Sequence, residues 1–462
     1  MQSLAAIAFV TLKAAYRFRL VNVLAALLIG VVVVLPSIIR DDGTARGFTQ
    51  IIITYTLSAI TGLLGMTTLW LACGTLAREI EECQIQVLAV KPVPRWKIWL
   101  GKWLGIMLLN SLLIGVAGAG VYGLLHKKSS SLPPEEQAIL RNEVLVARAG
   151  VREEVPDIEK DVEVLLKERL KDAAVASMDR NFVRNQLREQ LKARQQLVPP
   201  GFARRWTIKL GLAKDFVRDQ QLYVRVKFFV PPDQASTLNP KSYEGMWEIG
   251  PPDTQKRARK QVSLAADSFH EFPIPANLYD KDGVLTIDYQ NHSETAILFP
   301  LEEGIEVLYP ESGFTVNFIR GLCVILCWLG LLAALGLTAA SFLSFPVAAF
   351  LSVGVLIILF SGGTISSVVR DGTIVGLSDE GGPVERSPLD VVAVPMFKGL
   401  LHVIQLVQSV SPIDSLSSGR SITWLQLGGA FSQIVLLFGG GLAALGISIF
   451  NRRELAIAQH QQ

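Results

Sequence analysis

The most distinctive polar residues of this chain lie in a segment that separates two long apolar stretches. The segment begins with the acidic residues Glu79, Glu81 and Glu82 and becomes basic after Pro92. Acidic side chains favour the start of a helix and prolines interrupt one, so we expect a short polar helix over residues 78–92. A soluble partner that held this helix would move both of the flanking apolar segments.

The other reactive side chains show no spacing that serves catalysis or metal binding. The five histidines have no metal-ligand spacing, and the chain has no Gly-x-x-x-x-Gly-Lys-Ser/Thr phosphate loop. Cys323 and Cys327 lie one helical turn apart in an apolar stretch, where small packing residues are the simpler interpretation. We therefore predict no catalytic, cofactor-binding or metal-binding residue in this chain.

Charge divides the chain into two kinds of sequence. Residues 127–315 hold 56 of the 85 charged side chains and are 30% charged, whereas the other 273 residues are 11% charged. This division excludes a single soluble globule, a disordered chain and a coiled coil. The net charge of +3 is too small to indicate a nucleic-acid partner.

The apolar stretches predict membrane-spanning helices, each of which needs about 20 apolar residues. We count six, three on each side of the charged block, with the fourth and fifth joined at Ser344-Phe345-Pro346. They are Leu20–Ile39, Gly47–Ala77, Trp103–Leu125, two helices within Gly321–Val369, and Ile422–Phe450. The corresponding domain ranges are residues 20–126, 316–369 and 422–450.

Lysine and arginine in the short flanks predict the orientation. They are concentrated in residues 1–19, in residues 78–102 and in the tail 451–462. By the positive-inside rule these three segments share the cytoplasmic side, so both termini are cytoplasmic and the block 127–315 lies outside. Residues 1–19 mix apolar and basic side chains, which predicts an amphipathic helix in contact with membrane lipid, with a cytoplasmic extension of the first span as the alternative.

The extracytoplasmic block is predicted to be an α+β domain. Residues 133–198 have helical periodicity, as in Val162 and Leu166, and we expect a helical hairpin there. Residues 202–312 contain short alternating runs such as Leu222–Val230, separated by turn-forming residues, which predicts a β-sandwich. We expect this domain to bind a structural or envelope partner.

A second extracytoplasmic segment is predicted over residues 370–421. Within it, Leu389–Val410 is apolar but interrupted by Asp390 and Pro395. We expect short surface-lying or re-entrant helices there rather than a seventh span.

Small residues recur at a spacing of four at the start of the third predicted span and along it, which favours close packing within the chain or in a dimer. Gly101 and Gly105 form one such pair, and Gly115 and Gly123 belong to another run. This spacing permits close contact between helices. Gly439–Gly441 are expected to interrupt the sixth helix.

The polar connection resembles the permease subunits of type-2 ABC (ATP-binding-cassette) exporters. In that family the same place reads roughly Glu-x-Glu-x-Gly-Thr, then Leu-Leu, Pro-Val-x-Arg and Gly-Lys. This chain departs from the pattern at Cys83-Gln84 and carries an insertion, residues 127–315, that is not a general family feature. The matching residues are, in order, Glu79, Glu81, Val87-Leu88, Pro92-Val93-Pro94-Arg95 and Gly101-Lys102.

The resemblance implies the membrane subunit of an exporter in a bacterial cytoplasmic membrane. ATP and Mg²⁺ would be bound by a separate cytoplasmic ATPase, and a second permease subunit, identical or different, would complete the transporter. The segment Glu79–Leu88 would be the coupling helix seated on the ATPase. The predicted interface residues are Glu79, Glu81, Glu82, Gln84, Leu88, Pro92, Arg95 and Lys102.

Two other classes of function compete with this interpretation. A membrane-anchored envelope scaffold, or a component of a motility or secretion complex, would bind through residues 127–315. An ion-coupled carrier is disfavoured, because the predicted spans contain almost no ionisable side chains that could relay protons or hold ions.

Overall fold

The chain forms two compact units in a computed structural model. The helical unit comprises Met1–Ala147 and Gly313–Gln462, and the β unit comprises Arg148–Ser312. The structure describes residues 2–17, 19–39, 44–82, 84, 93–130, 132–154, 157–171, 180–215, 217–231, 242–252, 254, 256–371, 389–408 and 411–453.

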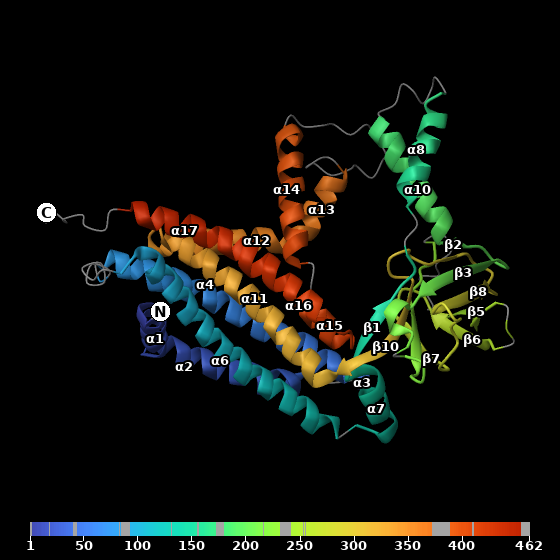
Figure 1. The fold of residues 1–462 in the computed structure, drawn as a ribbon, viewed down its shortest axis with the longest axis horizontal. Helices are drawn as coiled ribbons and strands as arrows, with labels where there is room; N and C mark the ends of the chain where they lie inside the picture. Colours follow the sequence, from blue (N-terminus) through green and yellow to red (C-terminus); the bar gives the residue numbers. More distant parts are fainter. Residues whose placement is uncertain are drawn as a thin grey trace. The chain divides into compact units, whose positions relative to one another are not determined.

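The helical unit is built from two runs of helices, one on each side of the β unit in sequence (Figure 1). The first run contains α1 (Gln2–Arg17), α2 (Arg19–Ile38), α3 (Ala45–Thr49), the π-helical turn η1 (Gln50–Thr56), α4 (Leu57–Glu81), α6 (Arg95–Ser129), α7 (Pro134–Ile139) and η2 (Leu140–Val144). The second contains α11 (Phe314–Ala340), α12 (Phe345–Phe360), α13 (Gly362–Asp371), α14 (Asp390–Gln408), α15 (Pro412–Ser417), α16 (Trp424–Ala430), the π-helical η4 (Phe431–Gly439) and α17 (Gly440–Arg452).

Four helical segments of the described residues are long and apolar enough to cross a membrane. They are Gly47–Glu81, Arg95–Ser129, Phe314–Ala340 and Trp424–Arg452. A fifth candidate is the bent pair Phe345–Leu359 and Gly362–Val369. α2 occupies the place of the first predicted span, but its apolar part, Asn22–Ile38, is shorter than these segments. By length and composition the chain is a multi-pass membrane protein.

α11 lies at the centre of the helical unit and packs against α4, α6, α12 and α17 (Figure 1). Its buried residues include Val324, Ala333 and Leu337, which belong to the same apolar core as Ile60 and Leu64 of α4. Side chains on the opposite faces of these helices remain exposed, as expected for helices surrounded by lipid.

Glycines allow two of these helices to approach closely. A Cβ atom at Gly105 of α6 would lie 2.7 Å from the carbonyl oxygen of Ala8, and one at Gly101 would lie 2.7 Å from Ile7. The predicted close packing at this pair is therefore confirmed, and its partner is α1. At Gly115 and Gly123 a Cβ atom would have no neighbour within 4 Å, so the described residues of the chain supply no close partner there and packing in a dimer stays a prediction.

Two predicted helix ends differ from the observed ones. The fifth span does not run unbroken to Val369, because α12 ends at Phe360 and α13 continues at an angle of 55°. Ser361 lies at the break and its hydroxyl donates to the carbonyl of Ile357, an arrangement common at sharp kinks. The glycines 439–441 do not interrupt the last helix, because Gly439 keeps helical dihedrals (φ −63°) after the π-helical turn.

The apolar stretch Leu389–Val410 forms one helix, α14, over its described residues rather than a pair of short ones. Pro395 lies inside this helix and does not end it. α14 packs against α13, which supplies the second member of a helix pair. Residues 372–388, between α13 and α14, lie outside the described residues.

The β unit contains two four-stranded sheets and one short two-stranded sheet. Their orders are β1-β10-β4-β7, β3-β8-β5-β6 and β2-β9. The strands are β1 (Val146–Val151), β2 (Leu197–Val198), β3 (Ala203–Lys209), β4 (Leu222–Val226), β5 (Ser242–Ile249), β6 (Ala258–Ala265), β7 (His270–Ile274), β8 (Val284–Asn291), β9 (Ile297–Leu298) and β10 (Ile305–Gly313).

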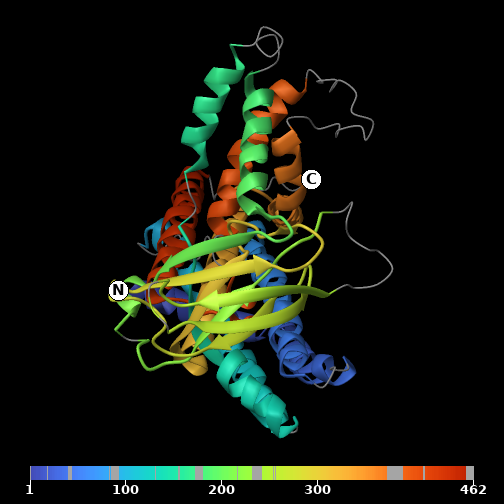
Figure 2. The same cartoon turned by 90° about the vertical axis from the view of Figure 1, so that its right-hand side faces the viewer.

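The two larger sheets share one apolar core and form a sandwich, as Figure 2 shows with the strands turned toward the viewer. Trp206 of β3 and Trp247 of β5 come from one sheet, whereas Phe272 of β7 comes from the other. The rings of Trp247 and Phe272 are 5.7 Å apart, so aromatic contact joins the two layers.

The helical part of the β unit is a pair of helices, α8 (Ile158–Arg169) and α10 (Arg180–Gln196), which pack against each other. Val162 and Leu166 are buried between them, as their spacing predicts. The prediction of helix over all of residues 133–198 is wrong at β1, because Val146–Val151 pairs with β10. Backbone pairing with a distant strand overrides the local pattern there.

The β unit is also narrower than the predicted block 127–315. α6 continues to Ser129, and α7 packs against α3 in the helical unit. The backbone N–H of Ala45 donates to the Glu136 carboxylate of α7 at 2.7 Å, which fastens this contact.

Candidate functional site

Two acidic residues of the predicted coupling segment, Glu79 and Glu81, lie at the end of a long helix. α4 runs without a break from Leu57 to Glu81, so Glu79 and Glu81 occupy its last turn. Carboxylates are unfavourable at this end of a helix, because the backbone carbonyls already give it a partial negative charge. Each of the two carboxylates is offset by a partner from another helix.

Glu79 pairs with a buried lysine of α6. The ammonium of Lys102 donates to Glu79 Oε1 at 2.6 Å and to the carbonyl of Thr75 at 3.0 Å. Lys102 is only 2% exposed, although an ammonium is costly to bury without a counter-charge. This pair ties the end of α4 to α6 about two turns into that helix.

Glu81 holds the beginning of α12. Its carboxylate accepts a hydrogen bond of 2.8 Å from the backbone N–H of Phe345, one of the unpaired donors at a helix start. The guanidinium of Arg78 lies 4.2 Å from the centre of the Phe345 ring. α4 therefore contacts the turn between α11 and α12 through the Glu81 carboxylate and the Arg78 guanidinium.

Arg95 holds the end of α17. Its Nη1 atom donates to the carbonyl oxygens of Phe450, Asn451 and Arg453 at 2.7, 2.9 and 2.8 Å. Helix-end carbonyls lack partners within the helix, and a cation is favoured beside them. Arg453 in turn donates to the carbonyl of Ser341 at 3.0 Å, which joins α17 to the end of α11.

These contacts bring the ends of α4, α11 and α17 together with the starts of α6 and α12. We call the group the helix-end cluster, and its side chains are Arg78, Glu79, Glu81, Arg95, Lys102, Phe345 and Arg453. Through these contacts the end of α4 is linked to α6 and α12 directly and, through Arg95 and Arg453, to α17 and α11.

The predicted interface residues separate into four groups. Glu82 and Gln84 are exposed and bond to each other at 2.6 Å, so they are available to a soluble partner. Lys102 is buried and in this conformation faces Glu79 instead of solvent. Leu88 and Pro92, like most of residues 83–92, lie outside the described residues. Glu79, Glu81 and Arg95 bind other helices of the unit.

Sequence reasoning missed Arg78, Phe345 and Arg453 as members of the cluster. Their positions at helix ends and the basic character of Arg78 and Arg453 are visible in the sequence. Which end each of them meets depends on how the helices pack, and no local pattern shows that.

The other end of α11 is held by side-chain hydrogen bonds to backbone groups. Asn317 donates to the carbonyl of Arg420 and accepts from the N–H of Ile422, both at 2.7 Å. Arg320 donates to the carbonyl of Ile422 at 2.9 Å and lies 4.5 Å from the Trp424 ring. Arg320 therefore has a packing role at the start of the last long helix.

The β unit contains a buried ion network across one sheet. Glu271 of β7 accepts from Arg148 at 3.0 Å and from Arg225 at 2.6 Å. Arg225 also faces Glu306 of β10 at 3.9 Å, and Arg152 lies 3.4 Å from Glu306. The Glu271 carboxylate thus compensates two buried guanidinium groups, those of Arg148 and Arg225.

An ion pair on the other sheet perturbs an acidic pKa. Burial by itself would raise the pKa of Asp288, but hydrogen bonds from Arg205 and Arg257 hold it below its ordinary value. The bond from Arg205 Nε is 2.7 Å long. The ionised form of Asp288 is therefore the one that stabilises the folded β unit.

Within the described residues, no three His, Cys, Asp or Glu side chains gather in a way that could hold a metal ion. Comparisons of the chain with protein-family models, with curated proteins and with solved structures find no match.

Proposed function

We propose that this chain is the membrane subunit of an ATP-driven exporter of the bacterial cytoplasmic membrane. In this proposal six helices cross the membrane, both termini are cytoplasmic and the β unit is extracytoplasmic. A separate ATPase binds ATP and Mg²⁺ and docks on the connection between α4 and α6. A second permease subunit completes the transporter.

The observation that carries the proposal is the helix-end cluster. Three of the residues that the family resemblance assigns to ATPase coupling bond to other helices: Glu79 to Lys102 of α6, Glu81 to the start of α12 and Arg95 to the end of α17. A subunit that moved the connection between α4 and α6 would therefore displace the helices bonded to it, and not a loop without such bonds. An ordinary loop between helices needs no such bonds.

The charges at this end support the proposed orientation. Arg95 and Arg453, which belong to two flanks assigned to the cytoplasm by their basic residues, meet in one hydrogen-bonded group. Lys97 lies one helical turn from the same group. A side rich in lysine and arginine is the side expected to face the cytoplasm.

The proposed mechanism is a shift between two arrangements of the spans. ATP binding would bring the two ATPase subunits together and move the exposed Glu82 and Gln84 with them. Glu79 and Glu81 would carry this motion to α6 and to the α11–α12 turn. Such coupling requires the ATPase to bind one arrangement of the helices more tightly than the other.

The test uses the full chain purified in mild detergent from its own membranes. A photoreactive azido-ATP should label a co-purified polypeptide present in stoichiometric amount. Glu82→Lys should sharply reduce its recovery without loss of helix content, because Glu82 is exposed and its side chain bonds to Gln84, which is exposed as well. Glu135→Lys, which changes an exposed glutamate of α7, is the matched control.

Two results would contradict the proposal. The first is that no ATP-labelled subunit co-purifies, whereas envelope components do co-purify and are lost when the β unit is altered. That result would favour the scaffold function. The second is full retention of the ATPase by Glu82→Lys, which would remove the connection as its docking site.

A further inference from the structure

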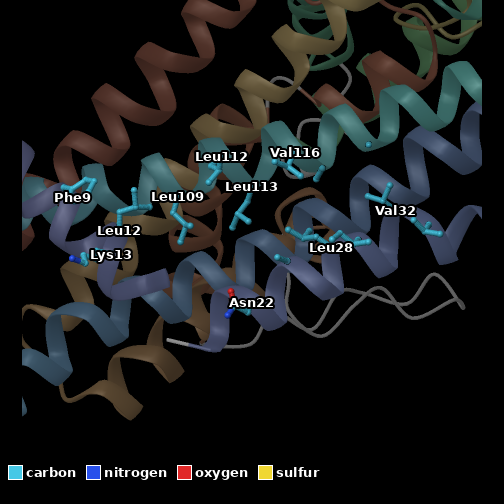
Figure 3. A pocket seen from close by; sticks show the side chains of 15 residues that line it. Phe9, Leu12, Lys13, Asn22, Leu28, Val32, Leu109, Leu112, Leu113 and Val116 are labelled. Atoms are coloured by element: carbon cyan, nitrogen blue, oxygen red, sulfur yellow. The ribbon is translucent and has the colours of Figure 1, made fainter. Parts of the chain in front are cut away.

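An apolar groove runs between α1, α2 and α6 on the surface of the helical unit (Figure 3). Its volume is about 740 Å³, and 13 of its 15 lining residues are apolar. The two polar exceptions are Lys13 of α1 and Asn22 of α2. A groove of this composition suits a hydrocarbon chain. It offers too few polar partners along its walls for a charged or sugar-like ligand.

The two polar side chains lie toward the same end of the groove. Lys13 lies beside Phe9 and Leu12, away from Val32 at the opposite end (Figure 3). Asn22 is the first groove residue of α2, and Val32 lies three turns further on. A ligand with an anionic head and an apolar tail would meet a cation at one end and hydrocarbon side chains along the rest.

Lys13 is available for such a contact. Its side chain is exposed and makes no hydrogen bond or ion pair with any residue that the structure describes. Other basic residues of the helical unit, such as Lys102 and Arg95, are committed to carboxylate or carbonyl oxygens. Among the residues whose side chains the structure describes, Lys13 is the one charged residue that lines the groove.

The length of the groove matches one leaflet of a bilayer. On α6 it extends from Leu109 to Gly120, and at 1.5 Å per residue this spans about 16 Å. Half of a hydrocarbon core is about 15 Å thick. An acyl chain whose phosphate lay at Lys13 would therefore end near Val32 and Gly120, where the two helices close together.

We propose that this groove binds an acyl chain of an anionic phospholipid, with the lipid phosphate held by Lys13. The bound chain would fill the space that α1, α2 and α6 leave between them. This site requires only that α2 and α6 contact lipid, so it stands or falls independently of the ATPase.

The experiment uses the full chain in lipid nanodiscs that contain a trace of phosphatidylglycerol with a photoreactive diazirine in its acyl chain. Phosphatidylcholine with the same diazirine is the neutral comparison. Phosphatidylglycerol should label the groove residues of α2 and α6 more strongly than phosphatidylcholine does. Lys13→Gln should reduce that preference about five-fold, the effect of one lysine near an anionic lipid surface.

A second variant separates the groove from the charge. Val116→Trp places a large ring in the groove and should lower labelling by both lipids, and its side chain is 61% exposed, so folding should persist. Leu108→Trp is the control, because Leu108 is 58% exposed on α6 but does not line the groove.

Three results would overturn the proposal. Equal labelling by the two lipids would show that the groove has no preference for an anionic head. Labelling unchanged in Val116→Trp would place the lipid elsewhere. A photocrosslink from Val116 to another copy of the chain, at the expense of lipid labelling, would show that a second subunit occupies the groove.

Discussion

Removal of the Glu79 carboxylate leaves the ammonium of Lys102 buried without its counter-charge. Lys102 is 2% exposed, and its described partners are Glu79 Oε1 and the carbonyl of Thr75. In Glu79→Ala only the uncharged carbonyl would remain. The folded helical unit would then have to bury a cation, expel it toward solvent or deprotonate it.

The size of the effect follows from the burial of the two partners. Breaking a buried ion pair by removing one member typically costs about 3–5 kcal/mol. The side chain of Glu79 is 29% exposed, so water can partly replace its carboxylate. We therefore expect Glu79→Ala to lower the free energy of unfolding by about 3 kcal/mol, at the low end of that range.

The assay is a double-mutant cycle on the full chain in detergent, with unfolding by sodium dodecyl sulfate followed through tryptophan fluorescence. Lys102→Met removes the cation and keeps a long apolar side chain. Because the double variant Glu79→Ala/Lys102→Met buries no unpaired charge, its stability should return to within about 1 kcal/mol of the wild type.

Additive costs in the double variant, or a loss below about 1 kcal/mol in Glu79→Ala, would refute this reasoning. Either result would mean that Glu79 does not compensate Lys102 and is free to serve a partner. If the double variant is stable, it also allows ATPase recovery to be measured without the loss of folding that Glu79→Ala alone would cause.

Three further predictions concern other contacts. Gly105→Ala should destabilise the packing of α1 on α6 by about 1–3 kcal/mol, measured by unfolding in detergent. Gly115→Ala, at a position with open space around it, should not destabilise the protein, and equal effects of the two variants would contradict the close approach of α1 and α6. Glu271→Ala should lower the free energy of unfolding of the β unit by about 3–5 kcal/mol, measured as faster hydrogen exchange of its strands in the full chain. Glu189→Ala, at an exposed position, should leave exchange unchanged, and similar exchange in both variants would show that the buried guanidinium groups do not depend on Glu271. Asp288 has a lowered pKa in the folded state, so its contribution to the stability of the β unit is present at neutral pH and lost as pH falls below about 4. Asp288→Asn should therefore show a smaller acid-induced increase in hydrogen exchange than the wild type, and an identical increase would contradict this assignment.

Several features were accessible from the sequence because they depend on local composition. Apolar stretches of span length located α4, α6, α11 and the last long helix, and alternating residues located strands such as Val284–Asn291. The glycine spacing predicted a close approach at Gly101 and Gly105. Burial of a continuous apolar surface leaves a periodic trace in the chain, whatever the partner surface is.

The candidate site was only partly accessible. Glu79 and Glu81 were expected to start a helix, but they end one, because α4 continues to Glu81. Their carboxylates are compensated by Lys102 of α6 and by the backbone N–H of Phe345 in α12. Similarly, Val146–Val151 was expected to be helical and is a strand, because β10 pairs with it. In both places a partner distant in sequence decides between two locally acceptable structures.

The sequence alone determined that this chain is a multi-pass membrane protein with a charged block inserted between its apolar helices. The reason is that transfer to lipid depends on the composition of each segment by itself. Only the tertiary structure decided which helix ends meet, that Lys102 is buried against Glu79, and that α1, α2 and α6 leave a groove beside Lys13. These features depend on distances between segments, and such distances are set by the packing of all helices together.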